Sequence, residues 1–255
     1  MRVLWAFVAS LLVVAGLFAL SAERAPARTR SQPAGSGPTT NQVSAGRTLY
    51  LTSCASCHAA NGQGTAYGPS LAGVGAAAAD FQLSTGRMPF AENAGQQAKR
   101  KPPAFTPDQI RALVAYVASL GAGPAVPTIS TAPSLLPRGQ QLFIANCAPC
   151  HGATANGGAV GGGALAPPLS MATAVQVGEA MLTAPGQMPA FPLSGEDLTA
   201  VATYVEYLRT APNPGGFSIG GIGPVPEGFV AWLVGVSLLL LIVVLVGHDW
   251  DPRRT

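Results

Sequence analysis

Two long apolar runs lie near the ends of the 255-residue chain, in residues 3–22 and residues 228–248. Neither run contains a formally charged residue. Because about 20 apolar helical residues span the hydrocarbon core of a bilayer, each run is long enough to cross a membrane. The second run shows no amphipathic face, which argues against a helix buried in a soluble core. The sequence therefore predicts a transmembrane helix over 228–248.

The first apolar run has two interpretations that the residues leave open. Residues 1–22 are either a cleaved signal peptide or a retained membrane anchor. Ala25-Pro26-Ala27 offers a small-x-small cleavage site, whereas the apolar stretch is longer than a usual signal core. At the other end, Arg253 and Arg254 follow the second run, and the positive-inside rule places the tail 249–255 in the cytoplasm. The protein is expected at the cell membrane, with everything between the two runs outside the cytoplasm.

Between the two runs, the pattern of the chain repeats itself. Residues 23–40 and 122–133 are rich in Pro, Gly, Ser, Thr and Ala and are predicted linkers. Four landmarks recur in one order, which indicates two copies of one small domain, at 41–121 and 134–211, followed by a joining segment at 212–227. The landmarks are Cys54-Ala-Ser-Cys57-His58 and Cys147-Ala-Pro-Cys150-His151, Gly68-Pro69 and Ala166-Pro167, Met88-Pro89 and Met188-Pro189, and a last helix after Thr106 and after Ser194.

Each copy is predicted to begin and end with a helix, so the fold class is all-α. Thr106 and Ser194 are typical N-caps for the last helix of each copy. The apolar positions of that helix step by three or four residues in the first copy and form a stripe for packing. Leu49-Tyr50 and Leu142-Phe143 lie one turn before the cysteines, which predicts a first helix that packs on the last one.

Composition excludes some classes of function. Charged residues make up 10% of the chain, against roughly 25% in an ordinary soluble domain, and the only lysines are Lys99 and Lys101, so a nucleic-acid binder is excluded. With 31 Gly and 23 Pro, a single long-helix bundle is excluded too.

Charge is divided unevenly between the copies. Six basic and three acidic residues in 41–121 give a net charge of +3, and two basic and four acidic residues in 134–211 give −2. The cluster Lys99-Arg100-Lys101 lies in an insertion of the first copy. We expect it to be a solvated loop, with docking to a partner as the alternative.

The repeated cysteine motif carries the chemistry, because Cys-x-x-Cys-His is the pattern for covalent attachment of haem c. Two thiols one helical turn apart reach the two vinyl groups of one porphyrin, and the adjacent imidazole then lies over the ring face, where it can bind the iron. The sequence therefore predicts two covalently bound haem c groups, on Cys54, Cys57 and His58 and on Cys147, Cys150 and His151. A zinc site made from the two Cys-x-x-Cys pairs is one alternative, and it leaves both histidines and both Met-Pro pairs unexplained. A pair of structural disulfides is the other, and a gap of two residues would strain each bridge.

Met88 and Met188 occupy matching positions before a proline and are predicted to be the second axial ligands of the two irons. Ligation by His and Met suits electron transfer rather than oxygen or peroxide chemistry. Met171 and Met181 are expected only to fill gaps in the core. His248, at the end of the second apolar run, is expected to be an interfacial residue.

Two prolines are candidates for supporting the histidine ligands. Pro69 and Pro167 fall where a backbone carbonyl could accept the second N–H of the ligand imidazole and orient the ring. A proline that only forms a turn is the alternative.

Taken together, these residues resemble the dihaem cytochrome c subunit of actinobacterial cytochrome bc complexes. That family has two class I cytochrome c domains in tandem and one C-terminal membrane helix, and the resemblance covers nearly the whole chain from Gly46 onward. Its most specific parts are Ser84-Thr-Gly-Arg-Met-Pro89, Pro214-Gly-Gly-Phe217 and the segment 220–229 that leads into the apolar run.

The resemblance implies a subunit of a menaquinol–cytochrome c reductase, beside a cytochrome b subunit and a Rieske iron–sulfur subunit. It implies that electrons enter from the Rieske centre at the first haem and leave from the second haem to an aa-type cytochrome c oxidase. Carried onto this chain, the first haem is held by Cys54, Cys57, His58 and Met88, and the second by Cys147, Cys150, His151 and Met188.

On this reading the subunit belongs to an oxidoreductase, has no catalytic residues and performs no bond-making chemistry of its own. Three other functions remain as alternatives. The first is a membrane-anchored dihaem cytochrome that serves a different dehydrogenase or oxidase. The second is a dihaem peroxidase, which would need one iron without a methionine ligand. The third is a non-catalytic zinc or disulfide module.

Overall fold

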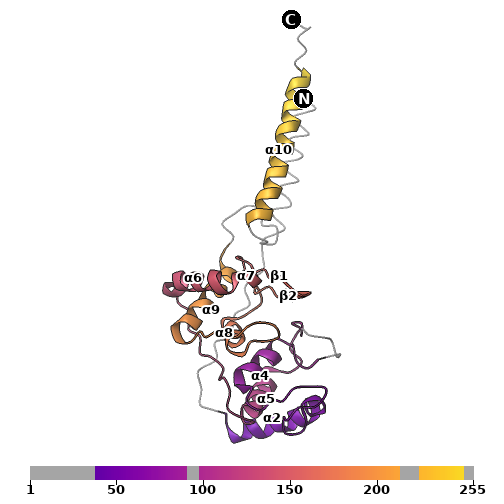
Figure 1. Cartoon of the computed structure of the whole chain (residues 1–255), viewed down its shortest axis with the longest axis vertical. Helices are drawn as coiled ribbons and strands as arrows, with labels where there is room; N and C mark the ends of the chain where they lie inside the picture. Colours follow the sequence, from indigo (N-terminus) through magenta and orange to yellow (C-terminus); the bar gives the residue numbers. More distant parts are fainter. Residues whose placement is uncertain (1–37, 91–97, 213–223, 250–255) are drawn as a thin grey trace. The chain divides into compact units, whose positions relative to one another are not determined.

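The computed structural model describes residues 38–90, 98–212 and 224–249 (Figure 1). The signal or anchor predicted at 1–22, most of the linker after it, and Arg253 and Arg254 lie outside the described residues. The all-α prediction is confirmed as a class, because the described elements are helices apart from one short two-stranded hairpin.

The first copy consists of four α-helices. α2 (Thr40–Ser53) leads through one residue into the single turn α3 (Ala55–His58); α4 (Gly75–Ser84) and α5 (Pro107–Ala118) follow. Thr106 caps α5 as predicted, since its Oγ accepts a hydrogen bond from the Gln109 N–H (3.3 Å) while the Gln109 side chain accepts one from the Thr106 N–H (2.9 Å). This capping box fixes the beginning of the last helix.

The second copy has the same order of helices with two additions. A 3-10 turn (Pro133–Leu135) precedes α6 (Leu136–Asn146), which is followed by α7 (Ala148–His151), α8 (Ala174–Thr183) and α9 (Gly195–Thr210). Ser194 stands at the N-cap of α9, but its side chain makes no capping hydrogen bond. The other addition is an antiparallel hairpin of β1 (Gly158–Gly161) and β2 (Ala164–Ala166), which the sequence did not predict.

The first and last helices of each copy cross at a glycine. α2 packs on α5 and α6 packs on α9, as predicted (Figure 1). A Cβ added at Gly46 would collide with the carbonyl oxygen of Ala112, and one added at Gly139 would collide with the carbonyl oxygen of Ala200. Only a residue without a side chain lets two helix backbones approach so closely.

An aromatic pair fills the same crossing in both copies. The rings of Tyr50 and Tyr116 lie 4.9 Å apart between centroids in the first copy, and those of Phe143 and Tyr204 lie 5.5 Å apart in the second. Tyr50 and Phe143 are fully buried. Such tilted pairs contribute about 0.5–1.5 kcal/mol beyond the area that they bury. The residues predicted to join the first helix to the last therefore do so.

One methionine prediction is confirmed and one is wrong. Met181 is 1% exposed and packs in the core of the second copy with Val201 and Val205. Met171 is 67% exposed, so it fills no gap. It stands in the turn before α8, where the chain runs over the surface.

The two copies touch through α4 and α8. The amide of Gln176 donates to the Ser84 hydroxyl (3.1 Å) and its carbonyl oxygen accepts from the guanidinium of Arg100 (3.0 Å). Arg100 is half-buried in this contact, so the expectation of a solvated loop is wrong for this member of the basic cluster.

Glu179 is a fully buried acid in the same contact. Its carboxyl group lies beside the carboxylate of Asp80. Burial, together with the charge of Asp80, raises the pKa of Glu179 to about 10. The side chain is therefore a neutral carboxylic acid at pH 7.

The last element that the structure describes is a long helix, α10 (Pro224–Asp249), which begins four residues before the predicted start. Within α10, residues Gly228–Gly247 are long and apolar enough to cross a membrane, and protein buries none of them. Phe229 and Trp232 are 60% and 61% exposed. Apolar side chains left uncovered over such a length match the hydrocarbon core of a bilayer, so this helix is a candidate membrane span.

The glycine at the helix crossing gives a first prediction. Gly46→Ala should lower the free energy of unfolding by about 1–3 kcal/mol, because its methyl group forces α2 away from α5. Ser44→Ala, at an exposed position of the same helix, is the control and should change it by less than about 0.5 kcal/mol. Denaturant unfolding of the detergent-solubilised full-length protein measures both. Equal stability of the two variants would contradict the close crossing.

The buried acid gives a second prediction. Because the pKa of Glu179 is raised on folding, the unfolded chain releases a proton that the folded chain keeps, and stability falls as pH rises from about 4.5 towards 10. Glu179→Gln removes this loss. The difference in free energy of unfolding between the variant and the native protein should therefore be about 1–3 kcal/mol more favourable to the variant at pH 8 than at pH 5. The control is Glu196→Gln, at an exposed position. Thermal unfolding at the two pH values decides, and the same pH dependence in native protein and Glu179→Gln would refute the buried neutral acid.

Candidate haem sites

Each cysteine motif forms one helical turn at the end of a longer helix. In the first copy the N–H groups of Cys57 and His58 donate to the Cys54 carbonyl (3.1 and 2.9 Å), and in the second copy those of Cys150 and His151 donate to the Cys147 carbonyl (3.2 and 2.8 Å). This turn is the arrangement predicted from the spacing, with both thiols and the imidazole held on one short segment. Cys54 and Cys147 lie toward the core, while Cys57 and Cys150 are exposed.

The two histidine rings are held in the same way. Nδ1 of His58 lies 2.8 Å from the carbonyl oxygen of Pro69, and Nδ1 of His151 lies 2.9 Å from the carbonyl oxygen of Pro167. An imidazole that donates from Nδ1 to a carbonyl keeps Nε2 as its basic nitrogen, the form that binds a metal. Burial lowers the pKa of His151, which favours the neutral form of the ring, the form that acts as a ligand.

The methionines border the same cores as the cysteines. Met88 and Cys54 pack against the core around Tyr50 and Leu113. In the second copy Met188 packs against the core that contains Cys147. A backbone hydrogen bond holds each methionine in its loop. The N–H of Met88 donates to the Gln82 carbonyl (3.0 Å), and that of Met188 donates to the Pro185 carbonyl (3.3 Å). The structure thus brings a cysteine and the predicted methionine of each copy to one core.

The cysteines suit thioether formation better than metal binding by thiolates. Burial raises the pKa of Cys54 and of Cys147 to about 11, which keeps these thiols protonated. None of the four cysteines is paired in a disulfide. Among the described residues no three side chains of His, Cys, Asp or Glu cluster as a metal site would require. The zinc and disulfide alternatives are therefore not supported by the geometry, whereas the turn, the neutral imidazole and the methionine fit haem c.

Two further residues hold the first motif in place, and the sequence analysis did not single them out for this role. The hydroxyl of Tyr50 donates to the Ala59 carbonyl (2.8 Å), just beyond His58, and the hydroxyl of Thr65 donates to the Cys57 carbonyl (2.6 Å). The sequence offered one clue to the role of the Tyr50 hydroxyl, because the matching residue of the second copy, Phe143, has no hydroxyl.

Arg87, directly before Met88, was also missed as a candidate site residue. Its guanidinium stacks over the Phe81 ring, 4.8 Å from the centroid, and its Nη1 is buried without a hydrogen-bond partner. Burial, together with the nearby charge of Arg100, lowers the pKa of Arg87. A buried cationic nitrogen without an acceptor is costly, so the position calls for an anion.

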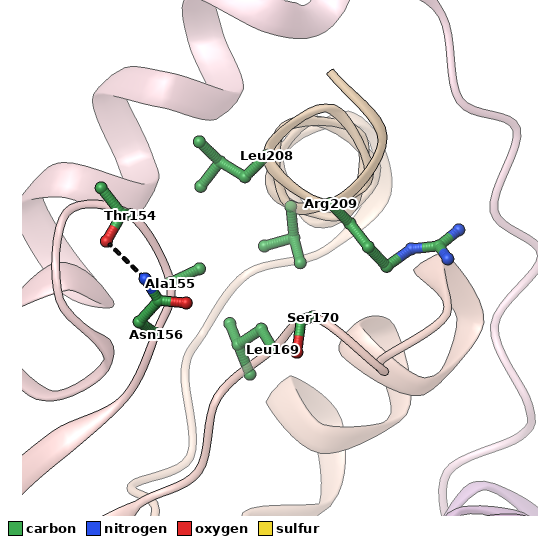
Figure 2. A pocket seen from close by; sticks show the side chains of 8 residues that line it. Thr154, Ala155, Asn156, Leu169, Ser170, Leu208 and Arg209 are labelled. Atoms are coloured by element: carbon green, nitrogen blue, oxygen red, sulfur yellow. Dashed lines mark hydrogen bonds between the residues drawn. The ribbon is translucent and has the colours of Figure 1, made fainter. Parts of the chain in front are cut away.

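A small pocket of about 80 Å³ lies in the second copy, between the loop after the cysteine motif and the end of α9 (Figure 2). Thr154, Asn156, Leu169 and Arg209 are among the residues that line it, and the Asn156 amide donates to the Thr154 hydroxyl (3.3 Å). Sites for small organic ligands occupy about 300–1,000 Å³. This pocket is therefore too small for a ligand site of that kind.

Comparison with known proteins agrees with this geometry at the level of class. Residues 43–121 match the family model described as Cytochrome c, and residues 134–205 match the model described as Cytochrome C oxidase, cbb3-type, subunit III. The chain is a c-type cytochrome with two cytochrome c domains, and it carries two covalently bound haem c groups.

More similar relatives define the family. A Mycobacterium tuberculosis protein named Cytochrome bc1 complex cytochrome c subunit is 44% identical over 214 residues, which cover 79% of this chain and 76% of the relative. A Corynebacterium diphtheriae protein of the same name is 38% identical over 226 residues, 80% of each chain. The chain therefore belongs to the family of cytochrome c subunits of cytochrome bc1 complexes.

A more distant relative is a subunit of another class of complex. The Cbb3-type cytochrome c oxidase subunit FixP of Sinorhizobium medicae is 34% identical over 126 residues, 45% of this chain and 40% of the relative. This match covers less than half of either chain.

Proposed function

We propose that this protein is the electron-relay subunit of a respiratory quinol–cytochrome c reductase, with the first haem ligated by His58 and Met88 and the second by His151 and Met188. The observation that carries the proposal is that both copies hold an imidazole on a proline carbonyl and turn a methionine onto the same core as a cysteine. Each haem supplies a one-electron Fe(II)/Fe(III) couple when bound. A site with both axial positions filled by the protein favours electron transfer over peroxide chemistry.

The protein's own residues supply position and access. Cys54 and Cys57, and likewise Cys147 and Cys150, would hold the porphyrin through their thiols on one helical turn. The carbonyls of Pro69 and Pro167 orient the ligand rings, because Nδ1 of each histidine is already bonded to them. The exposure of Cys57 and Cys150 supports an open haem edge at each site, where an electron-transfer partner can approach.

The proposed partners are a cytochrome b subunit, a Rieske iron–sulfur subunit and an aa-type cytochrome c oxidase. Electrons would enter at the first copy from the Rieske centre and leave from the second copy to the oxidase. The similarity to cytochrome bc1 subunits over about 80% of the chain supports the complex. The joining segment resembles that of the actinobacterial dihaem cytochrome c subunits, and the order of the partners is the one that this resemblance implies. In this arrangement α10 anchors the chain in the cell membrane and both copies lie outside the cytoplasm, as the basic pair after the helix predicts.

A second candidate is a cytochrome subunit of a cbb3-type oxidase. The match of residues 134–205 to that family and the similarity to FixP favour it. The bc1 relatives are more similar and cover more of the chain, so the reductase subunit is the better-supported function.

Substitution of the methionines tests the ligands. Met88→Leu and Met188→Leu should each convert one of the two haems from low-spin to a high-spin form that binds added ligands, because leucine has no sulfur to coordinate iron. Met171→Leu is the matched control, since that methionine is 67% exposed, and it should leave both haems low-spin. Absorption and electron paramagnetic resonance spectra of the purified protein give the readout. An unchanged spectrum in Met88→Leu or in Met188→Leu would remove that methionine from the ligand set.

Co-purification tests the partners. The full-length tagged protein, solubilised from its own membranes in mild detergent, should bring down a cytochrome b and a Rieske protein in equal amounts, together with an aa-type oxidase. Mass spectrometry identifies the subunits, and quinol-driven oxygen uptake by the purified complex confirms that the relay works. Recovery of a cbb3-type catalytic subunit in place of cytochrome b would replace the first candidate function with the second.

A further inference from the structure

The loop that carries Met88 is surrounded by positive charge that forms no ion pair within the described part of the chain. Arg87 precedes the methionine, and the segment with Arg100 and Lys101 is tied to the same loop. The Lys101 N–H donates to the Thr85 carbonyl (3.1 Å) and the Lys101 ammonium to the Pro89 carbonyl (3.2 Å). Among the described residues, no carboxylate forms an ion pair with any of these three side chains.

The backbone is built to hold these charges together. A Cβ at Gly86 would lie 2.7 Å from the Pro102 carbonyl oxygen and would also collide with the Lys101 carbonyl, so a glycine lets the two segments touch. This contact places Arg100 beside Arg87. Asp80 and Glu179, two acids at the contact between the copies, interact with each other instead.

Arg87 differs from a surface cation. Its guanidinium is stacked on Phe81 and its Nη1 is buried without any acceptor. A protein partner or a lipid headgroup arriving from solvent would pair with exposed atoms. A buried nitrogen next to an axial methionine calls for an anion that belongs to the interior, and the propionates are the carboxylates that haem c brings into a domain.

We propose that Arg87, supported by Arg100, binds a propionate of the first haem. The inference rests on the proposed ligation of that haem by Met88, which places the porphyrin beside the residue before it. Arg87 supplies a planar fork of donors for the carboxylate, and Arg100 adds a second positive charge. Arg100 is also bonded to Gln176 of α8, so the propionate site is joined to the second copy.

The site is specific to the first copy. Gln187 occupies the position of Arg87 in the second copy, and no segment corresponding to 99–102 lies between Met188 and Ser194. The two haems with the same ligand set would therefore differ in the charge around one propionate. Positive charge near a haem favours the reduced iron, so Arg87 raises the midpoint potential of the first haem.

Potentiometry of the full-length protein with both haems tests the proposal. Arg87→Gln should lower the midpoint potential of the first haem by at least a tenfold change in its reduction equilibrium constant, about 59 mV for a one-electron couple, and leave the second haem unchanged. Arg87→Lys keeps the charge and should cause a smaller fall. Arg47→Gln removes an exposed arginine of the same copy and is the matched control. A fall in Arg87→Gln no larger than that in Arg47→Gln would overturn the proposal.

A second readout separates contact from charge at a distance. Resonance Raman modes of the propionates should shift in Arg87→Gln and stay unchanged in Arg47→Gln. A lowered potential with unmoved propionate modes would mean that Arg87 acts only through space, and the assignment would be wrong. If Arg87→Gln does not retain its haem, Arg100→Gln takes its place, with the same two measurements and a smaller expected shift.

Failure of this proposal is distinguishable from failure of the proposed function. The native spectrum reports whether methionine ligates both irons, and this result is independent of Arg87. Native methionine ligation combined with no effect in Arg87→Gln would refute the propionate site alone. A native first haem without methionine ligation would refute the ligand set on which the site depends.

Discussion

The close crossing of the first and last helices is the constraint on which each domain depends. At Gly46 against Ala112, and at Gly139 against Ala200, the backbones approach to a distance that excludes any side chain. The cysteine turn leaves directly from the first helix, so the crossing fixes where the turn, its histidine and its thiols point. The proline carbonyl and the methionine then converge on a segment whose position is already set. This close contact lets a core with few aromatic residues hold the cysteine turn in a defined place.

With the ligand-bearing residues repeated, the differences between the copies lie in the surroundings. Tyr50 ties the end of the first cysteine turn through its hydroxyl, while Phe143 fills the same space without a hydrogen bond. The second copy has instead an uncharged hairpin, β1–β2, between its histidine and its proline. Charge follows the same division, with the first copy basic and the second acidic. The proposed ligand set, shared by both copies, would place both haems in one range of potential, and the differences in their surroundings would then set the two potentials apart.

The features predictable from the sequence were those that depend on spacing along one chain. The cysteine turn, the N-cap at Thr106, the packing of the first helix on the last and the long apolar helix all follow from periodicity or from local motifs. The missed features depend on contacts between distant segments. Arg100 was expected in solvent because a charged run in an insertion gives no sign that Gln176, 76 positions later, accepts its hydrogen bond. Glu179 lies in a helix whose pattern does not reveal a second domain on its polar side, so its burial could not be read from the sequence. The prediction that Met171 fills a gap in the core was wrong for a different reason, since an apolar residue in a loop can remain exposed.

The contact between the copies combines polar side chains with a buried acid, and both bear on the proposed electron relay between the two haems. It is polar, through Ser84, Gln176 and Arg100, and it holds the buried Glu179, whose raised pKa favours the protonated carboxyl group beside the charge of Asp80. In the proposed relay, a second negative charge beside Asp80 would oppose the passage of an electron from one copy to the other, and in a low-dielectric contact that opposition would be strong. Burial of Glu179 limits the negative charge by holding a proton, and Arg100 adds positive charge at the same contact. The same burial makes the contact depend on that proton. Titration of Glu179 would therefore change both the packing of the two copies on each other and the electrostatic potential between them.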